Sequence, residues 1–202
     1  MAEVVLYHHV QGLTDGVRAF ADELRRAGHT VHTPDLFDGS TFDTIDEGMS
    51  FAREAGFEAL LERGVAAAEG IGPGAVYAGV SFGVMPAQQV AQTRSDARGA
   101  VLMSACLPVA EFGGTWPERV PVQVHSKDAD PFFAEDLEAA KALVASSEVA
   151  ELFLYPGDEH LFADSSLPAY DAEAAALLTE RVLAFLERVE TERPATPEAL
   201  RR

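Results

Sequence analysis

The sequence predicts an α/β fold, in which a single domain holds a mostly parallel sheet covered by helices on both faces. Short apolar runs typical of buried strands alternate along the chain with longer segments of helical periodicity, a pattern typical of parallel sheets. The chain has 202 residues, enough for one sizeable core and too few for two ordinary domains. Hydrophobic residues make up 48% of it, which excludes a disordered polymer.

The first third of the chain predicts two strands and three helical segments. Apolar residues recur every three or four positions after Asp15, and Gly28 ends that helix. The segment Thr44 to Glu47 has the spacing of a capping box and opens a helical region that Gly56 divides. The predicted strands are residues 3–8 and 29–33, and the predicted helices are residues 15–27 and the divided region from residue 44 onward.

The rest of the chain continues the alternation. A strand and a helix occupy residues 75 to about 94, and a long loop rich in Gly and Pro follows the next strand. The other predicted elements are strands at 100–104, 120–125 and 151–155, and helices at 134–145 and 171–189. Inward-facing positions in these two helices include Leu137, Ala140, Leu143, Val144, Leu178, Val182, Phe185 and Leu186. We expect the domain to span residues 1–190 and a polar tail to span residues 191–202.

Charge and cysteine content limit the classes of partner and the compartment. The net charge is −18, with 33 acidic residues against 15 Lys and Arg, so binding to nucleic acid or to an anionic membrane is not expected. The N-terminus leads directly into a strand without the features of a signal peptide, and the single cysteine, Cys106, excludes an intrachain disulfide. We therefore expect a cytoplasmic protein.

The most informative motif is Gly79-Val80-Ser81-Phe82-Gly83, which lies between a predicted strand and a predicted helix. This context is typical of a nucleophile elbow, a sharp strand-to-helix turn that exposes a serine hydroxyl. Glycines on both sides let the backbone segments approach closely. The alternative is an ordinary tight turn, but the flanking strand and helix favour a catalytic Ser81.

A serine nucleophile needs a general base that a carboxylate orients, and in proteins with this elbow the order along the chain is Ser, acid, His. Of the six histidines, only His160 follows the candidate acids Asp128 and Asp130, which come directly after a predicted strand. Either aspartate can orient His160. Each is also a residue type common in turns and at helix starts.

An oxyanion hole requires two backbone N–H groups directed at the developing negative charge. The residue after the nucleophile, Phe82, supplies one of them. The second is expected from the turn after the first strand, where Val10 is the favoured donor.

With these residues the chain resembles the dienelactone hydrolase family of α/β-hydrolases, from about residue 3 to about residue 187. Three passages carry the resemblance: residues 5–12 leading to residues 34–37, the elbow at residues 79–83, and residues 155–162. The resemblance implies an α/β-hydrolase fold and places Asp130, rather than Asp128, at the position of the catalytic acid.

Three departures from the family pattern bear on specificity. Members with dienelactone activity use a cysteine where this chain has Ser81, and a glutamate in the first turn where this chain has His9. They also hold the substrate carboxylate with arginines, and Asp164 stands at the position of one of these. His9 is expected either to hydrogen-bond Ser81 or a substrate oxygen, or only to shape its turn. An aspartate cannot hold an anion, so dienelactone itself is not the expected substrate.

The sequence thus predicts a serine hydrolase that cleaves a small, uncharged ester or lactone through an acyl-enzyme. The candidate substrate contacts are His9, Trp116, Phe133 and Leu161. The last three belong to a group of apolar side chains in the loops around the predicted triad that also contains Phe82, Phe132 and Phe162. Such residues can line an apolar pocket, but aromatic residues beside strand ends serve equally often as packing. No cofactor and no metal are expected, since the His8-His9 and His29/His32 pairs point to opposite faces of their strands. We expect a monomer or a homodimer. The alternatives are a thioesterase or acyltransferase with the same triad, or a non-catalytic binding module of this fold.

Overall fold

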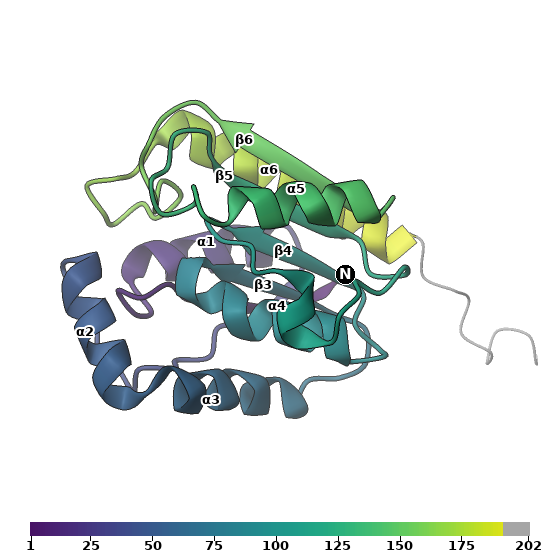
Figure 1. Ribbon diagram of the computed structural model, residues 1–202, viewed down its shortest axis with the longest axis horizontal. Coiled ribbons are helices and arrows are strands. Elements are labelled where there is room, and N and C mark those ends of the chain that lie inside the picture. Colours follow the sequence, from purple (N-terminus) through teal and green to yellow (C-terminus); the bar gives the residue numbers. More distant parts are fainter. Residues whose placement is uncertain (192–202) are drawn as a thin grey trace, which may run out of the picture.

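The computed structural model describes residues 1–191, which form one sheet of six parallel strands in the order β2-β1-β3-β4-β5-β6 (Figure 1). Every neighbouring pair in this sheet is parallel. The predicted mostly parallel sheet is therefore wholly parallel in this part of the chain. The strands are β1 (Glu3–Tyr7), β2 (Thr30–His32), β3 (Ala75–Val80), β4 (Gly99–Met103), β5 (Val122–Lys127) and β6 (Ala150–Tyr155).

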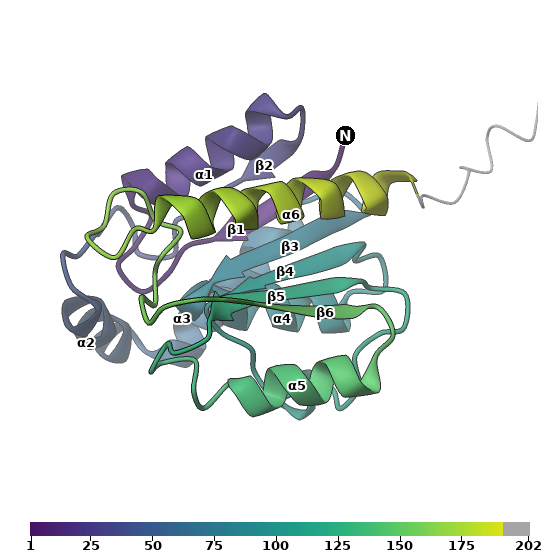
Figure 2. The same cartoon turned by 90° about the horizontal axis from the view of Figure 1, so that it is seen from above.

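Helices cover both faces of the sheet, as Figure 2 shows from above. Helices α1 (Asp15–Arg26) and α6 (Ala172–Thr191) lie on one face. The other face carries α3, α4 and α5, and α2 lies at one end of the molecule. Their bounds are α2 (Ile45–Ala55), α3 (Phe57–Glu69), α4 (Val84–Thr93) and α5 (Leu137–Ser146), and short 3₁₀ turns cover Ser81–Gly83 and Val109–Phe112.

The two faces of the sheet form two separate hydrophobic cores because side chains alternate along each strand. In β1, Val5 and Tyr7 pack toward α3 and α4, whereas Val4 and Leu6 pack toward α1 and α6. Strands β3 and β4 are buried at every position. A strand buried on both faces reads as a continuous apolar run, which is why these strands were visible in the sequence.

Most predicted elements are confirmed within a few residues, and the differences have local causes. The capping box at Thr44 is present, and Gly56, with φ of 88°, ends α2 and begins α3. Strand β5 starts two residues later than predicted, directly after Pro121, which has no amide hydrogen to donate to the sheet. It also continues to Lys127, which pairs with Tyr155 of β6.

Two predictions at the helices are corrected. Val144, which the sequence placed on the inner face of its helix, is 37% exposed. The helix begins at Leu137, three residues later than predicted, because residues 131–136 form turns. Thr191 is the last residue of α6, and the rest of the predicted tail, residues 192–202, lies outside the described residues.

The carboxyl ends of the strands define where a site can form, because ligands of parallel sheets bind outside those ends. In Figures 1 and 2, α2 and the connection between β6 and α6 lie at the same end of the sheet. No helix among residues 1–191 is long and apolar enough to cross a membrane.

Candidate active site

Ser81 follows β3 in a strained conformation. Its φ is 49°, in the left-handed region that residues with a side chain seldom adopt. Glycines on both sides make this turn possible. A Cβ on Gly79 would collide with the carbonyl of Gly83, and one on Gly83 would lie 2.5 Å from the carbonyl oxygen of Tyr7. The predicted elbow is present, with α4 starting directly after the turn.

His160 and Asp130 complete a continuous chain of hydrogen bonds with Ser81. The Oγ atom of Ser81 lies 2.7 Å from Nε2 of His160, and Nδ1 of His160 lies 2.7 Å from Oδ2 of Asp130. Because a carboxylate can only accept, Nδ1 carries the ring proton and Nε2 accepts the hydrogen of the Ser81 hydroxyl. Asp130 is 3% exposed, and its other oxygen accepts the amide of Phe132 at 2.9 Å. This geometry suits transfer of a proton from serine to histidine.

Asp128, the alternative acid, has a different contact. Its Oδ1 accepts the amide of Gly157 at 3.1 Å, and no hydrogen bond joins it to His160. The two loops are joined further by backbone bonds from Asp128 to Tyr155 and from Ala129 to Gly157. Asp128 therefore connects the acid loop to the histidine loop without reaching the imidazole.

Lys127 is the last residue of β5, directly before the loop of Asp128 and Asp130, and it was not predicted as a site residue. Its side chain is 1% exposed, and Nζ donates to the carbonyl of Pro156 at 2.7 Å and to Asp171 at 2.5 Å. It joins the end of β5 to the loop before His160 and to the residue before α6. It is one of only two lysines in the chain, which is the signal that could have drawn attention to it.

The turn after β1 presents the amide of Val10. The preceding carbonyl, that of His9, accepts from Gly12 at 3.0 Å and from Nδ1 of His8 at 2.8 Å. Since no peptide bond among residues 1–191 is cis, the N–H of Val10 points opposite to that carbonyl. In the described part of the chain it meets no protein acceptor. The amide of Phe82 lies in the first turn of a helix, where amides also lack an intrahelical partner.

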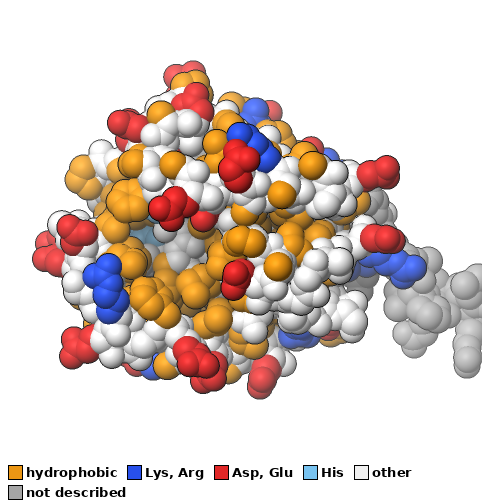
Figure 3. Space-filling view, viewed as in Figure 1, with side chains coloured by type: hydrophobic (Ala, Val, Ile, Leu, Met, Phe, Trp, Pro, Cys, Tyr) orange, Lys and Arg blue, Asp and Glu red, His pale blue; other side chains and the backbone are white. Residues whose placement is uncertain are grey.

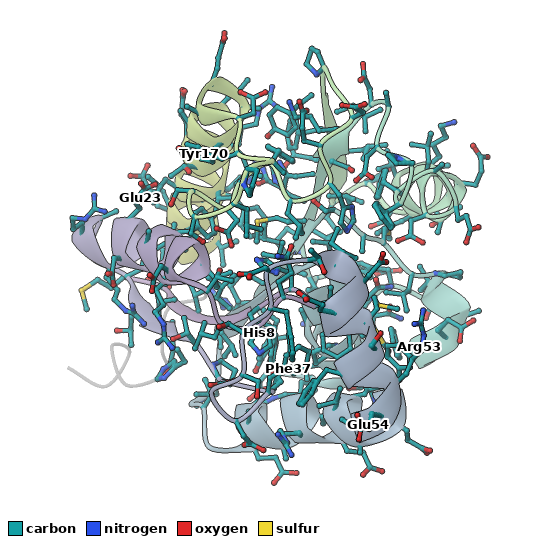
Figure 4. The ribbon with its side chains drawn as sticks, turned by 90° about the vertical axis from the view of Figure 1, so that its left-hand side faces the viewer. His8, Glu23, Phe37, Arg53, Glu54 and Tyr170 are labelled. Atoms are coloured by element: carbon teal, nitrogen blue, oxygen red, sulfur yellow. The ribbon has the colours of Figure 1, made fainter. Side chains whose placement is uncertain are left out.

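His8 holds this turn in place from inside the protein. Figure 4, which looks onto this end of the molecule, shows His8 next to Phe37, and their rings lie 4.8 Å apart. Nε2 of His8 accepts the amide of Leu36 at 3.0 Å. Burial lowers the pKa of His8 to about 4. The ring is therefore neutral near pH 7, with one nitrogen donating and the other accepting, as its two contacts require.

His9 does not contact Ser81, so the expectation of that hydrogen bond is wrong. Its ring is fully buried, with Nε2 donating to Asp164 at 2.7 Å and Nδ1 accepting the amide of Gln11 at 3.2 Å. Both nitrogens are thus in use, and neither remains for a substrate. His9 shapes its turn, which was the other expectation.

Asp164 receives four hydrogen bonds in total. Besides His9, the donors are the hydroxyl of Thr14 and the amide and hydroxyl of Ser166. Burial alone would raise the pKa of Asp164, but the bonds from His9, Ser166 and Thr14 outweigh it and lower the pKa to about 2. Asp164 is therefore a buried carboxylate that joins the first turn to the loop after His160.

The three other predicted substrate contacts are buried side chains. Trp116, Phe133 and Leu161 are 7%, 2% and 3% exposed and pack within the two cores. The indole N–H of Trp116 donates to Val120 within its own loop. Phe132 is instead 56% exposed, and its ring lies 4.7 Å from that of His160. Because the Asp130 turn holds the amide of Phe132, this side chain faces the solvent beside the imidazole while Phe133 faces the core.

The surface on this side of the molecule is hollowed. In Figure 3 a depression with histidine surface inside it is bordered mainly by hydrophobic side chains, and acidic side chains and a Lys or Arg side chain lie around it. An apolar depression next to an imidazole can take an uncharged organic group. Among residues 1–191 no cluster of three or more His, Cys, Asp or Glu side chains is arranged to hold a metal ion.

A family comparison agrees with this geometry. The model of the dienelactone hydrolase family matches residues 1–190. The chain belongs to the dienelactone hydrolase family. Membership makes it a hydrolase of ester bonds, and it confirms the resemblance predicted from the three sequence passages. No curated protein sequence matches the chain at a significant level.

Solved structures confirm the α/β-hydrolase fold. The dienelactone hydrolase from Anabaena variabilis is 18% identical with a TM-score of 0.67, over 93% of this chain and 86% of that one. A dienelactone hydrolase-like promiscuous phosphotriesterase from metagenomic libraries is 19% identical with a TM-score of 0.74, over 94% and 87%. A cold-adapted esterase from an Arctic intertidal metagenomic library is 20% identical with a TM-score of 0.62, over 91% and 82%. At these identities the likeness concerns the fold.

Proposed function

We propose that this protein is a serine hydrolase that cleaves a small, uncharged ester or lactone through an acyl-enzyme. The observation that carries the proposal is the unbroken hydrogen-bond chain from Ser81 Oγ through His160 to Asp130. In this mechanism Ser81 attacks the carbonyl carbon while Nε2 of His160 takes its proton. His160 then gives the proton to the leaving alcohol, and in the second half it activates water to release the acid. Asp130 holds the ring tautomer and stabilises the imidazolium.

The amides of Val10 and Phe82 stabilise the oxyanion in this proposal. Three features support their role: the fixed carbonyl of His9, the first-turn position of Phe82, and the close packing of Gly83 on β1. Both donors are backbone groups held before the reaction begins. Such preorganised donors cost no reorganisation as the negative charge develops.

We infer an uncharged substrate because neither Lys127 nor Asp164, which lie in or beside the loops around His160, is available to bind a substrate carboxylate. Lys127 is buried and fully engaged, and Asp164 stands where the family resemblance implies a substrate arginine. The exposed ring of Phe132 beside His160 offers an apolar surface for the acyl or alcohol part. The net charge of −18 also opposes an anionic substrate.

The setting of the enzyme is part of the proposal. The presence of a single, buried cysteine supports a cytoplasmic location. The triad needs no cofactor for this reaction. We propose that the protein acts as a monomer or homodimer, without nucleic acid or membrane partners.

Labelling with a fluorophosphonate and turnover of short p-nitrophenyl esters test the proposal directly. We expect covalent labelling on Ser81, loss of labelling in Ser81→Ala, and hydrolysis of acetyl and butyryl esters by the wild type. A protein that binds esters but neither labels nor hydrolyses them would instead be a non-catalytic binding module. Equal turnover of acyl-thioesters, or transfer of the acyl group to an added alcohol, would favour a thioesterase or acyltransferase.

A further inference from the structure

A second serine adopts the same unusual backbone conformation as Ser81. Ser104 follows β4 directly, has a φ of 59°, and is 3% exposed. Besides these two serines, only Asp38 among the non-glycine residues in the described part of the chain has a positive φ. Strained positions of this kind persist where the surrounding structure fixes them, and they concentrate at functional sites.

Ser104 is tied to Ser81 through the sheet. Strands β3 and β4 are neighbours, and Val80 pairs with Met103, so each serine is the first residue beyond a paired position. The amide of Ser104 continues the sheet on the other side by donating to the carbonyl of His125 at 2.7 Å. The position of Ser104 relative to Ser81 is therefore set by adjacent, hydrogen-bonded strands.

The hydroxyl of Ser104 reaches the histidine of the proposed triad. It donates to the backbone carbonyl of His160 at 2.6 Å, across 56 residues of sequence. His160 itself lies in the connection between β6 and α6, outside any helix or strand. Its ring is held by Ser81 and Asp130, and its backbone by this bond from the central sheet.

We propose that Ser104 is a positioning residue that fixes His160 at proton-transfer distance from Ser81. The inference rests on the proposed function of the triad. In this arrangement Ser81 and Ser104 both follow strands of the same rigid sheet, and Ser104 holds the backbone of His160. Movement of the surrounding surface loop therefore does not change the distance between His160 and Ser81. The left-handed conformation of Ser104 directs its hydroxyl out of the strand toward the loop.

Two substitutions separate the hydroxyl from the backbone conformation. Ser104→Ala removes the donor and keeps the Cβ, whereas Ser104→Gly removes the donor and also relieves the positive φ. Ser146→Ala is the matched control, because it removes a hydroxyl that donates to a carbonyl, that of Leu143, at the end of α5. All four proteins are assayed with p-nitrophenyl acetate and by thermal denaturation.

We expect kcat to fall about 10- to 100-fold in both Ser104 variants, with KM within about twofold of wild type, because small misplacements of a reacting group cost this much. The downfield NMR signal of the His160 Nδ1 proton, which reports its bond to Asp130, should shift or broaden in both. Ser146→Ala should change neither quantity. The NMR signal reads the position of His160 whether or not the ester is hydrolysed.

The outcomes distinguish the inference from the proposed function. If the wild type hydrolyses esters but both Ser104 variants keep its kcat and its NMR signal, the inference is overturned and the function stands. Recovery of wild-type kcat in Ser104→Gly alone would also overturn it, because the backbone rather than the hydroxyl would then matter. If the wild type hydrolyses no ester, the function fails. In that case a changed His160 signal in the variants still supports the anchor, and an unchanged one rejects it.

Discussion

Replacing Asp130 by asparagine should invert the tautomer of His160. Oδ1 of Asp130 accepts the amide of Phe132 at 2.9 Å, so in the variant the amide oxygen must stay on that side. The NH₂ group then faces Nδ1 of His160, which lies 2.7 Å from Oδ2 in the native protein. Because this NH₂ group can only donate, Nδ1 becomes an acceptor and the ring proton moves to Nε2. Nε2 can then no longer take the proton of Ser81.

The expected loss is about 10⁴-fold in kcat, the size seen when a triad histidine is held in the wrong tautomer, and this corresponds to about 5 kcal/mol in activation free energy. The side-chain volume and the bond to Phe132 are kept, so the melting temperature should change little. Steady-state hydrolysis of p-nitrophenyl acetate measures the loss, with Asp128→Asn as the control. Asp128 contacts Gly157 and not His160, so its variant should keep most of the activity. Asp130 is not the catalytic acid if Asp130→Asn keeps more than about a tenth of wild-type kcat while Asp128→Asn is inactive.

Three further predictions concern stability. Burial lowers the pKa of His125 to about 3, so the unfolded chain binds a proton below about pH 6.5 that the folded protein does not. Between about pH 6 and pH 4 this group alone should lower the free energy of unfolding by about 1.4 kcal/mol for each unit by which the pH falls. When the free energy of unfolding is measured by urea titration at several pH values, it should depend less steeply on pH in His125→Gln than in the wild type. Gly83→Ala should lower the free energy of unfolding by about 1–3 kcal/mol and should also lower kcat, because its Cβ would lie 2.5 Å from the carbonyl oxygen of Tyr7. Gly70→Ala is the control, because no atom lies within contact range of its Cβ, and its melting temperature should equal that of the wild type. Lys127→Met should cost about 1 kcal/mol in chemical denaturation, because the carbonyl of Pro156 and the partly exposed carboxylate of Asp171 lose a buried donor. An unchanged midpoint would count against this contact.

The parts of the fold that the sequence predicted are those that local chemistry controls. The capping box at Thr44 and the break at Gly56 depend on residues a few positions apart, and both are present. The elbow could also be recognised locally, because Gly79 and Gly83 are needed for close approach within one turn. The family resemblance then placed Asp130 rather than Asp128 as the partner of His160, and the distances in the structure agree with that choice.

Contacts between distant segments could not be predicted in the same way. Ser104 bonds to the carbonyl of His160 from a neighbouring strand, and nothing in the residues around Ser104 indicates that partner. Phe132 and Phe133 are adjacent and chemically identical, yet one is exposed and the other is buried. The turn at Asp130 decides between them, and its geometry depends on the bond to Phe132. Burial of this kind is a property of the assembled loops rather than of residue type.

The pair formed by His9 and Asp164 gives a structural reason for the uncharged substrate that we propose. The resemblance implies a glutamate and an arginine at these two positions, and this chain has a base in place of the acid and an acid in place of the arginine. Here the two side chains bond to each other across 155 residues, and both are buried. Asp164 is further saturated by Thr14 and Ser166, so it cannot turn toward a ligand without losing several bonds. A position that could serve recognition of an anion is thus used to join the turn of Val10 to the loop of His160. His9 and Asp164 therefore stand where the resemblance implies a glutamate and a carboxylate-binding arginine, and they stabilise the two backbone segments that the proposed ester hydrolysis requires.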